Sequence, residues 1–395
     1  MLESLTSIPP DPLLKLIGEF ASDKRAHKID LGVGVYRNAA GRTDVMKAVK
    51  RAEQKLIDEQ PSKAYVGMAG DVEFVDEIRQ LSFGRAFKGE GCLTGLQTTG
   101  GSAALRLAGD LIYRSNPEAK LWVGLPCWSN HIPIFQAAGL KVQTYKRYDL
   151  EKAQIDFETV MASLAGAKAG DVVLLQGCCD NPTGADLSAD EWKTIADLCA
   201  QRGLTPLLDI AYQGLGQSLQ ADVSGAAILL QRVPEAFITV SCSKNFGLYR
   251  ERTGALFVLA SNPLEADISR ANVFSIARTN YSMPPDHGGA VVKVILQNAD
   301  LRAIWQSELN EMRARISLMR MALSDILTAF DARYDFLKRQ QGMFSLLPLS
   351  PAQVSALKAD HAIYMAGSGR INLAGLNEKT VAEFGVALKL VLAEG

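Results

Sequence analysis

The sequence lacks the pattern of a structural metal site. Its 395 residues include six cysteines and four histidines, and no two cysteines are spaced as C-x-x-C. Structural zinc sites use cysteine and histidine at short, regular spacings, so we expect no metal. The adjacent Cys178 and Cys179 could form a redox-active pair. In a chain of this size, however, the pair is more typical of buried free thiols.

The chain also lacks an excess of charge and any long apolar run. Its 42 basic and 43 acidic residues give a net charge of −1. This balance provides no basic face for nucleic acid or for an anionic membrane. No run approaches the roughly 20 apolar residues of a membrane span, and the first residues do not resemble a targeting segment. We therefore expect a cytoplasmic protein without nucleic-acid or membrane partners.

Two phosphate-binding motifs are missing as well. Neither G-x-G-x-x-G nor G-x-x-x-x-G-K-[ST] occurs, and in LGVGVYR (31–37) Arg37 takes the place of the last glycine. A nicotinamide or nucleoside triphosphate site therefore has little support.

Apolar stretches that alternate with helical stretches fill the middle of the chain. Strands are expected at 120–125, 141–146, 171–177, 204–210, 236–242 and 253–260. Continuous apolar strands alternating with helices are typical of a mostly parallel sheet covered on both faces, so we expect an α/β fold. A capping box at Ser188 predicts a helix that Gly203 ends.

The last part of the chain predicts a second, smaller unit. The stretch 290–330 has no proline or glycine and predicts a long helix, and a final helix is expected near 377–393. We expect the C-terminal region to form a smaller α+β lobe, which the N-terminal segment joins.

Polar residues follow the predicted strands at their carboxyl ends, where ligands bind in such sheets. Asn181 follows 171–177, and Lys244 follows 236–242. Asp209 lies at the end of 204–210, and Tyr212 lies in the loop after it. In TTGGSAALR, Ser102 and two glycines precede a helix. Free backbone N–H groups there could hold a phosphate, although a glycine turn with a serine cap explains the pattern equally.

Each of these polar groups has a structural and a chemical interpretation. Asp209 could cap a turn, or it could pair with a protonated ring nitrogen, because a buried carboxylate needs a partner. Trp128 could pack in the core or stack on a ring. His131 could orient Asp209 or be a core histidine.

Lys244 could be a solvated strand end or a reactive amine. A poorly exposed lysine near cations has a lowered pKa and attacks aldehydes. Together with a phosphate cradle, a buried carboxylate and hydrogen-bond donors for a phenolic oxygen, it describes a pocket for pyridoxal phosphate (PLP). Arg370 and Arg278 could bind substrate carboxylates, or each could form a surface ion pair.

Several motifs, taken together, resemble the aspartate/aromatic aminotransferases. These motifs are N-P-T-G at 181–184, D-x-x-Y at 209–212, S-x-S-K-N-F-G-x-Y-x-E-R at 241–252 and S-G-R-x-N at 368–372. The third is highly specific, whereas N-P-T-G alone is not. The resemblance extends from IDLGVGVY (29–36) to the end of the chain.

The resemblance implies a class I, PLP-dependent enzyme of fold type I. Its large domain would hold a mostly parallel seven-stranded sheet, beside a smaller α+β domain. The implied division is an N-terminal segment of the small domain at 1–45, a large PLP-binding domain at 46–309 and a C-terminal small domain at 310–395.

The resemblance also implies residue roles. Lys244, Asp209 and Tyr212 would be catalytic: Lys244 bonds to the cofactor aldehyde and carries a proton, Asp209 pairs with the ring nitrogen, and Tyr212 binds the ring oxygen. The cofactor-binding residues would be Ser102, Ala103, Trp128, Asn181, Asp209, Tyr212, Ser241, Ser243, Lys244, Arg252 and Tyr65. The substrate-binding residues would be Gly34, Trp128, Asn181, Arg278 and Arg370. Tyr65 and Arg278 would reach the neighbouring subunit's site, which implies a homodimer with shared sites.

The activity so implied is transfer of an amino group from aspartate, and from aromatic amino acids, to 2-oxoglutarate by a ping-pong mechanism. The alternatives are an aminotransferase that prefers aromatic amino acids, a PLP-dependent β-lyase or decarboxylase, and a catalytically silent PLP-fold binding domain.

The chain departs from the family pattern at a few positions. Gln176 and Asp180 stand where the family has histidines, and the first of these histidines belongs to the surroundings of the aspartate. Ala103 replaces a glycine of the phosphate loop. Met283 replaces a smaller or polar residue, and Ser102 stands in place of threonine. The last two changes favour members that accept aromatic substrates.

Overall fold

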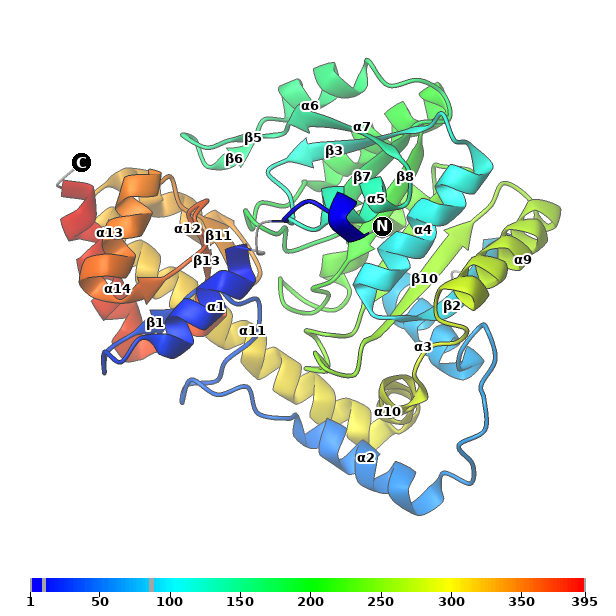
Figure 1. Ribbon diagram of the computed structural model, residues 1–395, viewed down its shortest axis with the longest axis horizontal. Helices are drawn as coiled ribbons and strands as arrows, with labels where there is room; N and C mark the ends of the chain where they lie inside the picture. Colours follow the sequence, from blue (N-terminus) through cyan, green and yellow to red (C-terminus); the bar gives the residue numbers. More distant parts are fainter. Residues whose placement is uncertain (1, 9–11, 85–88, 394–395) are drawn as a thin grey trace.

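A seven-stranded sheet forms the centre of the larger lobe (Figure 1). The computed structural model describes residues 2–8, 12–84 and 89–393. From one edge to the other, the sheet runs β2 (Leu93–Thr99), β10 (Thr253–Leu259), β9 (Ala236–Ser241), β8 (Thr205–Ile210), β7 (Val172–Gln176), β3 (Lys120–Leu125) and β4 (Lys141–Lys146). β10 is antiparallel to both of its neighbours, and the other pairs are parallel. The expected mostly parallel α/β sheet is confirmed.

Helices cover both faces of this sheet, as its alternating side chains require. Val172 and Leu174 of β7 point into a core shared with α4 and α5. Val173 and Leu175 point into the opposite core, which α7 and α8 cover. The helices of this lobe are α2 (Lys47–Glu59), α3 (Val72–Phe83), α4 (Gly101–Ser115), α5 (His131–Ala137), α6 (Phe157–Leu164), α7 (Ala189–Arg202), α8 (Ser224–Leu230), α9 (Pro263–Asn280) and α10 (Asp286–Gln297).

A smaller lobe has its own apolar core. Its elements are α1 (Pro12–Ser22), β1 (Ile29–Asp30), α12 (Phe336–Arg339), β11 (Phe344–Leu346), α13 (Pro351–His361), β12 (Ile363–Tyr364), β13 (Arg370–Asn372) and α14 (Glu378–Ala393). β1 pairs in parallel with β12, so the beginning of the chain lies in the C-terminal lobe. Two short strands, β5 (Tyr148–Asp149) and β6 (Gln154–Ile155), pair with each other. Of the predicted division, residues 1, 9–11, 85–88, 394 and 395 lie outside the described residues.

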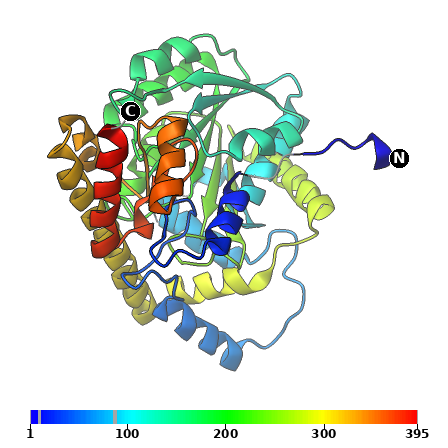
Figure 2. The ribbon, with the colours of Figure 1, turned by 60° about the vertical axis from the view of Figure 1, so that its left-hand side comes forward.

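The long helix α11 (Ala299–Thr328) connects the lobes (Figures 1 and 2). Its first part, which includes Trp305 and extends to Ile316, packs into the core of the large lobe. Met319 and Leu323 pack into the core of the small lobe. The helix therefore ties the two cores together.

The stretch 290–330 is helical, as predicted, but it forms two helices, because α10 and α11 are separate. Asn298 lies between them in an extended conformation, and its side chain accepts a hydrogen bond from the N–H of Leu301. An asparagine in this position caps a new helix. The predicted capping box at Ser188 and helix end at Gly203 are confirmed. Among the described residues, no helix is long and apolar enough to cross a membrane.

Candidate active site

The carboxyl ends of β7, β8 and β9 meet the beginning of α4 around an open cavity. The predicted residues that line the cavity are Gly34, Ser102, Trp128, Asn181, Asp209, Tyr212, Ser241, Ser243, Lys244 and Arg252. Parallel strand order has thus brought together groups that are far apart in the chain.

Asp209 lies near the end of β8, and neighbouring residues fix its carboxylate. The Nε2 atom of His131 lies 2.8 Å from Oδ2, and the Thr239 hydroxyl donates to Oδ1 at 3.2 Å. His131 is fully buried, and its Nδ1 atom has no hydrogen-bond partner. The ring of Trp128 meets His131 edge-on at 5.2 Å between centroids. Of the two interpretations of His131, the structure supports the one in which it orients Asp209.

Lys244 extends into the cavity from the turn after β9. Its Nζ lies 5.0 Å from the centroid of the Tyr212 ring. Burial lowers the pKa of Lys244 to about 8, with help from Arg252 and Arg370 and against the opposing effect of Asp209. At pH 7, roughly a tenth of the amine is therefore neutral and nucleophilic, far more than at the usual lysine pKa.

The end of the cavity next to α4 is suited to an anion. The first N–H groups of α4 have no partners within the helix, and its dipole is positive there. Arg252 lies beside Gly100, where an added Cβ would come within 2.7 Å of the guanidinium Nη2. Arg252 donates to the Ser243 hydroxyl at 3.5 Å and forms no ion pair with any described carboxylate.

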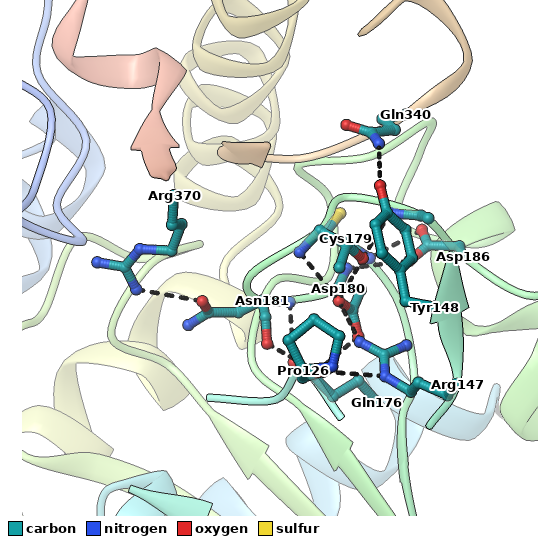
Figure 3. A network of polar contacts seen from close by, with 12 residues as sticks. Pro126, Arg147, Tyr148, Gln176, Cys179, Asp180, Asn181, Asp186, Gln340 and Arg370 are labelled. Atoms are coloured by element: carbon teal, nitrogen blue, oxygen red, sulfur yellow. Dashed lines mark hydrogen bonds and ion pairs between the residues drawn. The ribbon is translucent and has the colours of Figure 1, made fainter. Parts of the chain in front are cut away.

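Arg370 does not line the cavity but is buried next to it, in contact with the cavity residue Asn181 (Figure 3). It has no carboxylate partner among the described residues. Its Nη1 donates to Asn181 Oδ1 at 3.2 Å, and its Nη2 donates to the carbonyl of Gly32 at 2.6 Å. The buried Nε has no partner. Burial lowers the pKa of Arg370, so a carboxylate bound here would supply its missing counter-charge.

Asn181 connects Arg370 with the phenol of Tyr212. Its Nδ2 donates to the Tyr212 hydroxyl at 3.3 Å. Burial, together with Asp209, raises the pKa of Tyr212 well above its usual range, so the phenol stays protonated and can donate.

Some predicted residues do not reach this cavity. Tyr65 is 90% exposed. Arg278 is exposed at the end of α9 and donates to the Ser282 hydroxyl. Ala103 lies in the first turn of α4 but does not line the cavity. Within a single chain, Tyr65 and Arg278 therefore do not form part of the site.

The structure adds residues that sequence reasoning missed. Tyr249 lines the cavity, and its hydroxyl accepts a hydrogen bond from the N–H of Tyr36. Its place in the motif at 241–252 was a signal that could have identified it. Arg147 forms an ion pair with Asp180, and their separation of 33 positions in the sequence hid this contact from sequence reasoning.

Cys178 and Cys179 are buried thiols, as predicted. Their sulfur atoms lie close to the carboxylate of Asp222. That carboxylate already accepts hydrogen bonds from the backbone N–H groups of 214, 216, 217 and 218. A hydrogen bond with Cys178, together with burial, raises the pKa of Cys179 well above its usual value. The group therefore has neither the thiolates nor the free oxygens that a metal site needs.

Pyridoxal phosphate fits this donor set. Its phosphate would lie at the beginning of α4 with Arg252, its ring nitrogen at Asp209, and its aldehyde at Lys244. The unpartnered Nε of Arg370 is left for a substrate carboxylate. Each charged group of the cofactor thus has a partner of complementary charge.

Comparisons with known proteins agree with this arrangement. The family described as "Aminotransferase class I and II" matches residues 26–388. A tyrosine aminotransferase of Rhizobium meliloti (strain 1021) is 49% identical over 97% of this chain and 98% of its own length. An aspartate aminotransferase of Escherichia coli (strain K12) is 40% identical over 99% of this chain and all of its own.

A solved structure extends the similarity to the cofactor. It is an aromatic-amino-acid aminotransferase from Burkholderia pseudomallei, covalently bound to pyridoxal phosphate. Its TM-score is 0.96, with 36% identity, and the match covers 99% of each chain.

Proposed function

The chain belongs to the class I and II aminotransferases, which use pyridoxal phosphate, and we propose that it transfers amino groups from aspartate and aromatic amino acids to 2-oxoglutarate. The observation that carries this proposal is a lysine of pKa about 8 in a cavity next to the buried Arg370. Arg370 donates to the cavity residue Asn181, and its Nε has no partner. The relatives named above, one for tyrosine and one for aspartate, support both substrate classes.

We propose the following roles for the residues. When bound, pyridoxal phosphate supplies an aldehyde for the amino group and a ring that accepts electrons. Lys244 Nζ would take up the proton of the substrate Cα and give it back during the transfer. Asp209, held by His131, would keep the ring nitrogen protonated, and Asn181 and Tyr212 would donate to the ring oxygen. The phosphate would be held by Ser102, the amide of Ala103, Ser241, Ser243 and Arg252, with Trp128 against the ring.

Arg370 would hold the α-carboxylate of the substrate, with help from Asn181 and the backbone of Gly34. Its planar guanidinium suits two-point binding of a carboxylate. Because the same carboxylate occurs in both substrates and both products, one site serves both halves of a ping-pong reaction.

We propose a homodimer in which Tyr65 and Arg278 complete the neighbouring site. Tyr65 would reach the phosphate, and Arg278 would reach the substrate side chain. The exposure of both residues in the single chain supports this proposal. The exposed apolar side chains of Leu2, Leu5 and Ile8, on a segment that extends away from the body in Figure 2, offer further surface for a partner.

We also propose the division of the chain into 1–45, 46–309 and 310–395, with the small lobe closing over bound substrate. A cytoplasmic location is supported by the cysteines of the chain, all of which are free thiols.

A half-reaction panel tests the substrate proposal. The PLP-loaded protein is mixed with aspartate, glutamate, phenylalanine or tyrosine, with alanine as control, and the absorbance change to the pyridoxamine form is followed. Reaction with the dicarboxylates and the aromatics supports the proposal. Reaction with aromatics alone would favour the alternative of aromatic preference, which the tyrosine aminotransferase relative supports. If none reacts, the proposed function is wrong.

A further inference from the structure

Gln176 and Asp180, which stand where the family pattern has histidines, form a buried network with Arg147 (Figure 3). Arg147 lies between β4 and β5, and its Nη2 donates to both carboxylate oxygens of Asp180 at 2.6 Å. Its Nε donates to the carbonyl of Pro126 at 3.0 Å. The side chains of Arg147 and Asp180 are only 15% and 4% exposed. The ion pair is therefore shielded from solvent and fixed in direction.

Asp180 also organises the turn that follows it. One of its oxygens accepts from both the N–H and the hydroxyl of Thr183, at 3.1 and 2.6 Å. The other accepts from Gln176 Nε2 at 2.6 Å. Asp180 thus links three segments: the end of β7, the turn after it, and the connection between β4 and β5.

The side-chain amide of Gln176 forms hydrogen bonds with both the carbonyl and the N–H of Asn181. Its Nε2 donates to the Asn181 carbonyl at 2.9 Å, and its Oε1 accepts from the Asn181 N–H at 3.0 Å. A two-point contact with the main chain fixes the peptide planes around Asn181. The direction of the Asn181 side chain is fixed as a result.

That side chain contacts both the residue proposed to bind substrate and a residue proposed to bind the cofactor. Its Oδ1 accepts from Arg370, and its Nδ2 donates to Tyr212. Gln176 is adjacent to Asp209 across β7 and β8, but the Asp209 carboxylate bonds to His131 and Thr239 instead. The network therefore acts on Asn181 and not on the carboxylate of Asp209.

We propose that Arg147, Asp180 and Gln176 are positioning residues that hold Asn181 in the orientation needed by Arg370 and Tyr212. Burial of an ion pair contributes little net stability, so its role here is to define geometry. The inference rests on the proposed function, because it assigns Asn181 to substrate and cofactor.

The first test is Gln176→Met, which keeps the volume of the side chain and removes both contacts with Asn181. The dissociation constant of succinate, a non-reacting dicarboxylate, is measured on the PLP-loaded protein. We expect it to rise about tenfold, the effect of losing roughly 1.4 kcal/mol of hydrogen bonding that orients Arg370. In steady state, KM for aspartate should rise more than kcat falls.

A spectroscopic measurement needs no substrate. Donors to the ring oxygen favour its anionic form, so loosening Asn181 should move the pH midpoint of the visible band of the lysine-bound cofactor to higher pH. The matched control is Gln340→Met. Gln340 is a buried amide that donates to the Tyr148 hydroxyl on the other side of the network and does not touch Asn181 (Figure 3).

If Gln176→Met fails to fold, Asp180→Asn, Arg147→Met and the double variant decide. Arg147 and Asp180 act through one ion pair. The effect of the double variant on succinate affinity should therefore be well below the sum of the two single effects. The inference is wrong if these variants move succinate affinity and the band midpoint no more than Gln340→Met does. If the variants shift as described but the wild-type protein transfers no amino group, the proposed function is wrong and the positioning role is still supported.

Discussion

At the residue scale, the burial of Lys244 has a cost in the free energy of unfolding that can be measured. The folded protein lowers the pKa of this lysine from 10.5 to about 8, mainly by burial. Between these two pH values the unfolded chain binds the proton and the folded chain does not, so apoprotein stability rises with pH across this window. Below about pH 8 both states are protonated, and the full penalty remains.

Lys244→Met should therefore stabilise the apoprotein at pH 7. We expect a gain of up to about 3 kcal/mol in the free energy of unfolding, which shrinks from about pH 8 and disappears by pH 10.5. Urea unfolding at several pH values measures it. A gain independent of pH would show that the charge of the lysine is not its cause.

Asp209→Asn should slow the half-reaction while leaving the protein folded. An amide of the same shape cannot keep a ring nitrogen protonated, so we expect a loss of about 10²–10³ in the rate with aspartate. Asp171→Asn is the control. Asp171 is a buried aspartate that accepts from Lys120, Lys168 and Trp122 outside the cavity. Equal losses of rate in both variants would contradict the role of Asp209.

Sequence reasoning identified single residues when they belonged to compact motifs. Examples are Lys244, Asp209 and Asn181, each of which lies at the end of a predicted strand or just after it. All three line one cavity. The partner of Asp180 was not found, because Arg147 lies on another strand connection and no local pattern marks it. Long-range ion pairs depend on how elements pack.

At the element scale, the beginning of α4 is shaped by a glycine that no other residue can replace without strain. Gly100 has φ of +83°, and a Cβ there would meet the guanidinium of Arg252. Backbone strain at positive φ and collision with Arg252 are separate effects. A second glycine with the same strain but no such neighbour distinguishes them. Gly84 ends α3 with φ of +82°, and an added Cβ would meet nothing within 4 Å.

Gly100→Ala and Gly84→Ala should both lose about 1 kcal/mol or more of stability, because alanine is strained at positive φ. Only Gly100→Ala should weaken PLP binding, by about tenfold, because only there is Arg252 displaced. Fluorescence titration of the apoproteins with PLP measures this. Equal PLP affinities in the two variants would show that Arg252 does not hold the phosphate.

Elements were predicted best where the chain is apolar and continuous. The bounds of β3 and β4 match the prediction, and β7 to β10 differ by one or two residues. β2 was not predicted, because LTGLQTT has a glycine and no continuous apolar run. It lies at the sheet edge, where a strand needs less apolar character. Asn298 was overlooked because a cap within a helical pattern is ambiguous from sequence.

At the scale of the whole molecule, we propose that the exposed Tyr65 and Arg278 complete the site of a neighbouring chain. If Arg278 serves the neighbour, two inactive variants should complement each other. In a mixed dimer of Lys244→Ala and Arg278→Ala, one site has its lysine and receives a normal Arg278 from the partner. Mixing should restore aspartate turnover, and refolding the variants separately should not. Failure to restore activity in isolated mixed dimers would contradict sharing of the sites.

Transfer of labelled nitrogen tests the central claim most directly. The holoenzyme is incubated with [¹⁵N]aspartate and 2-oxoglutarate, and the products are examined by mass spectrometry. We predict [¹⁵N]glutamate and oxaloacetate with the wild-type protein, and neither with Lys244→Ala. Labelled ammonia or alanine as the main product would instead indicate a lyase or decarboxylase. Wild-type rates of [¹⁵N]glutamate formation in Lys244→Ala would contradict the mechanism.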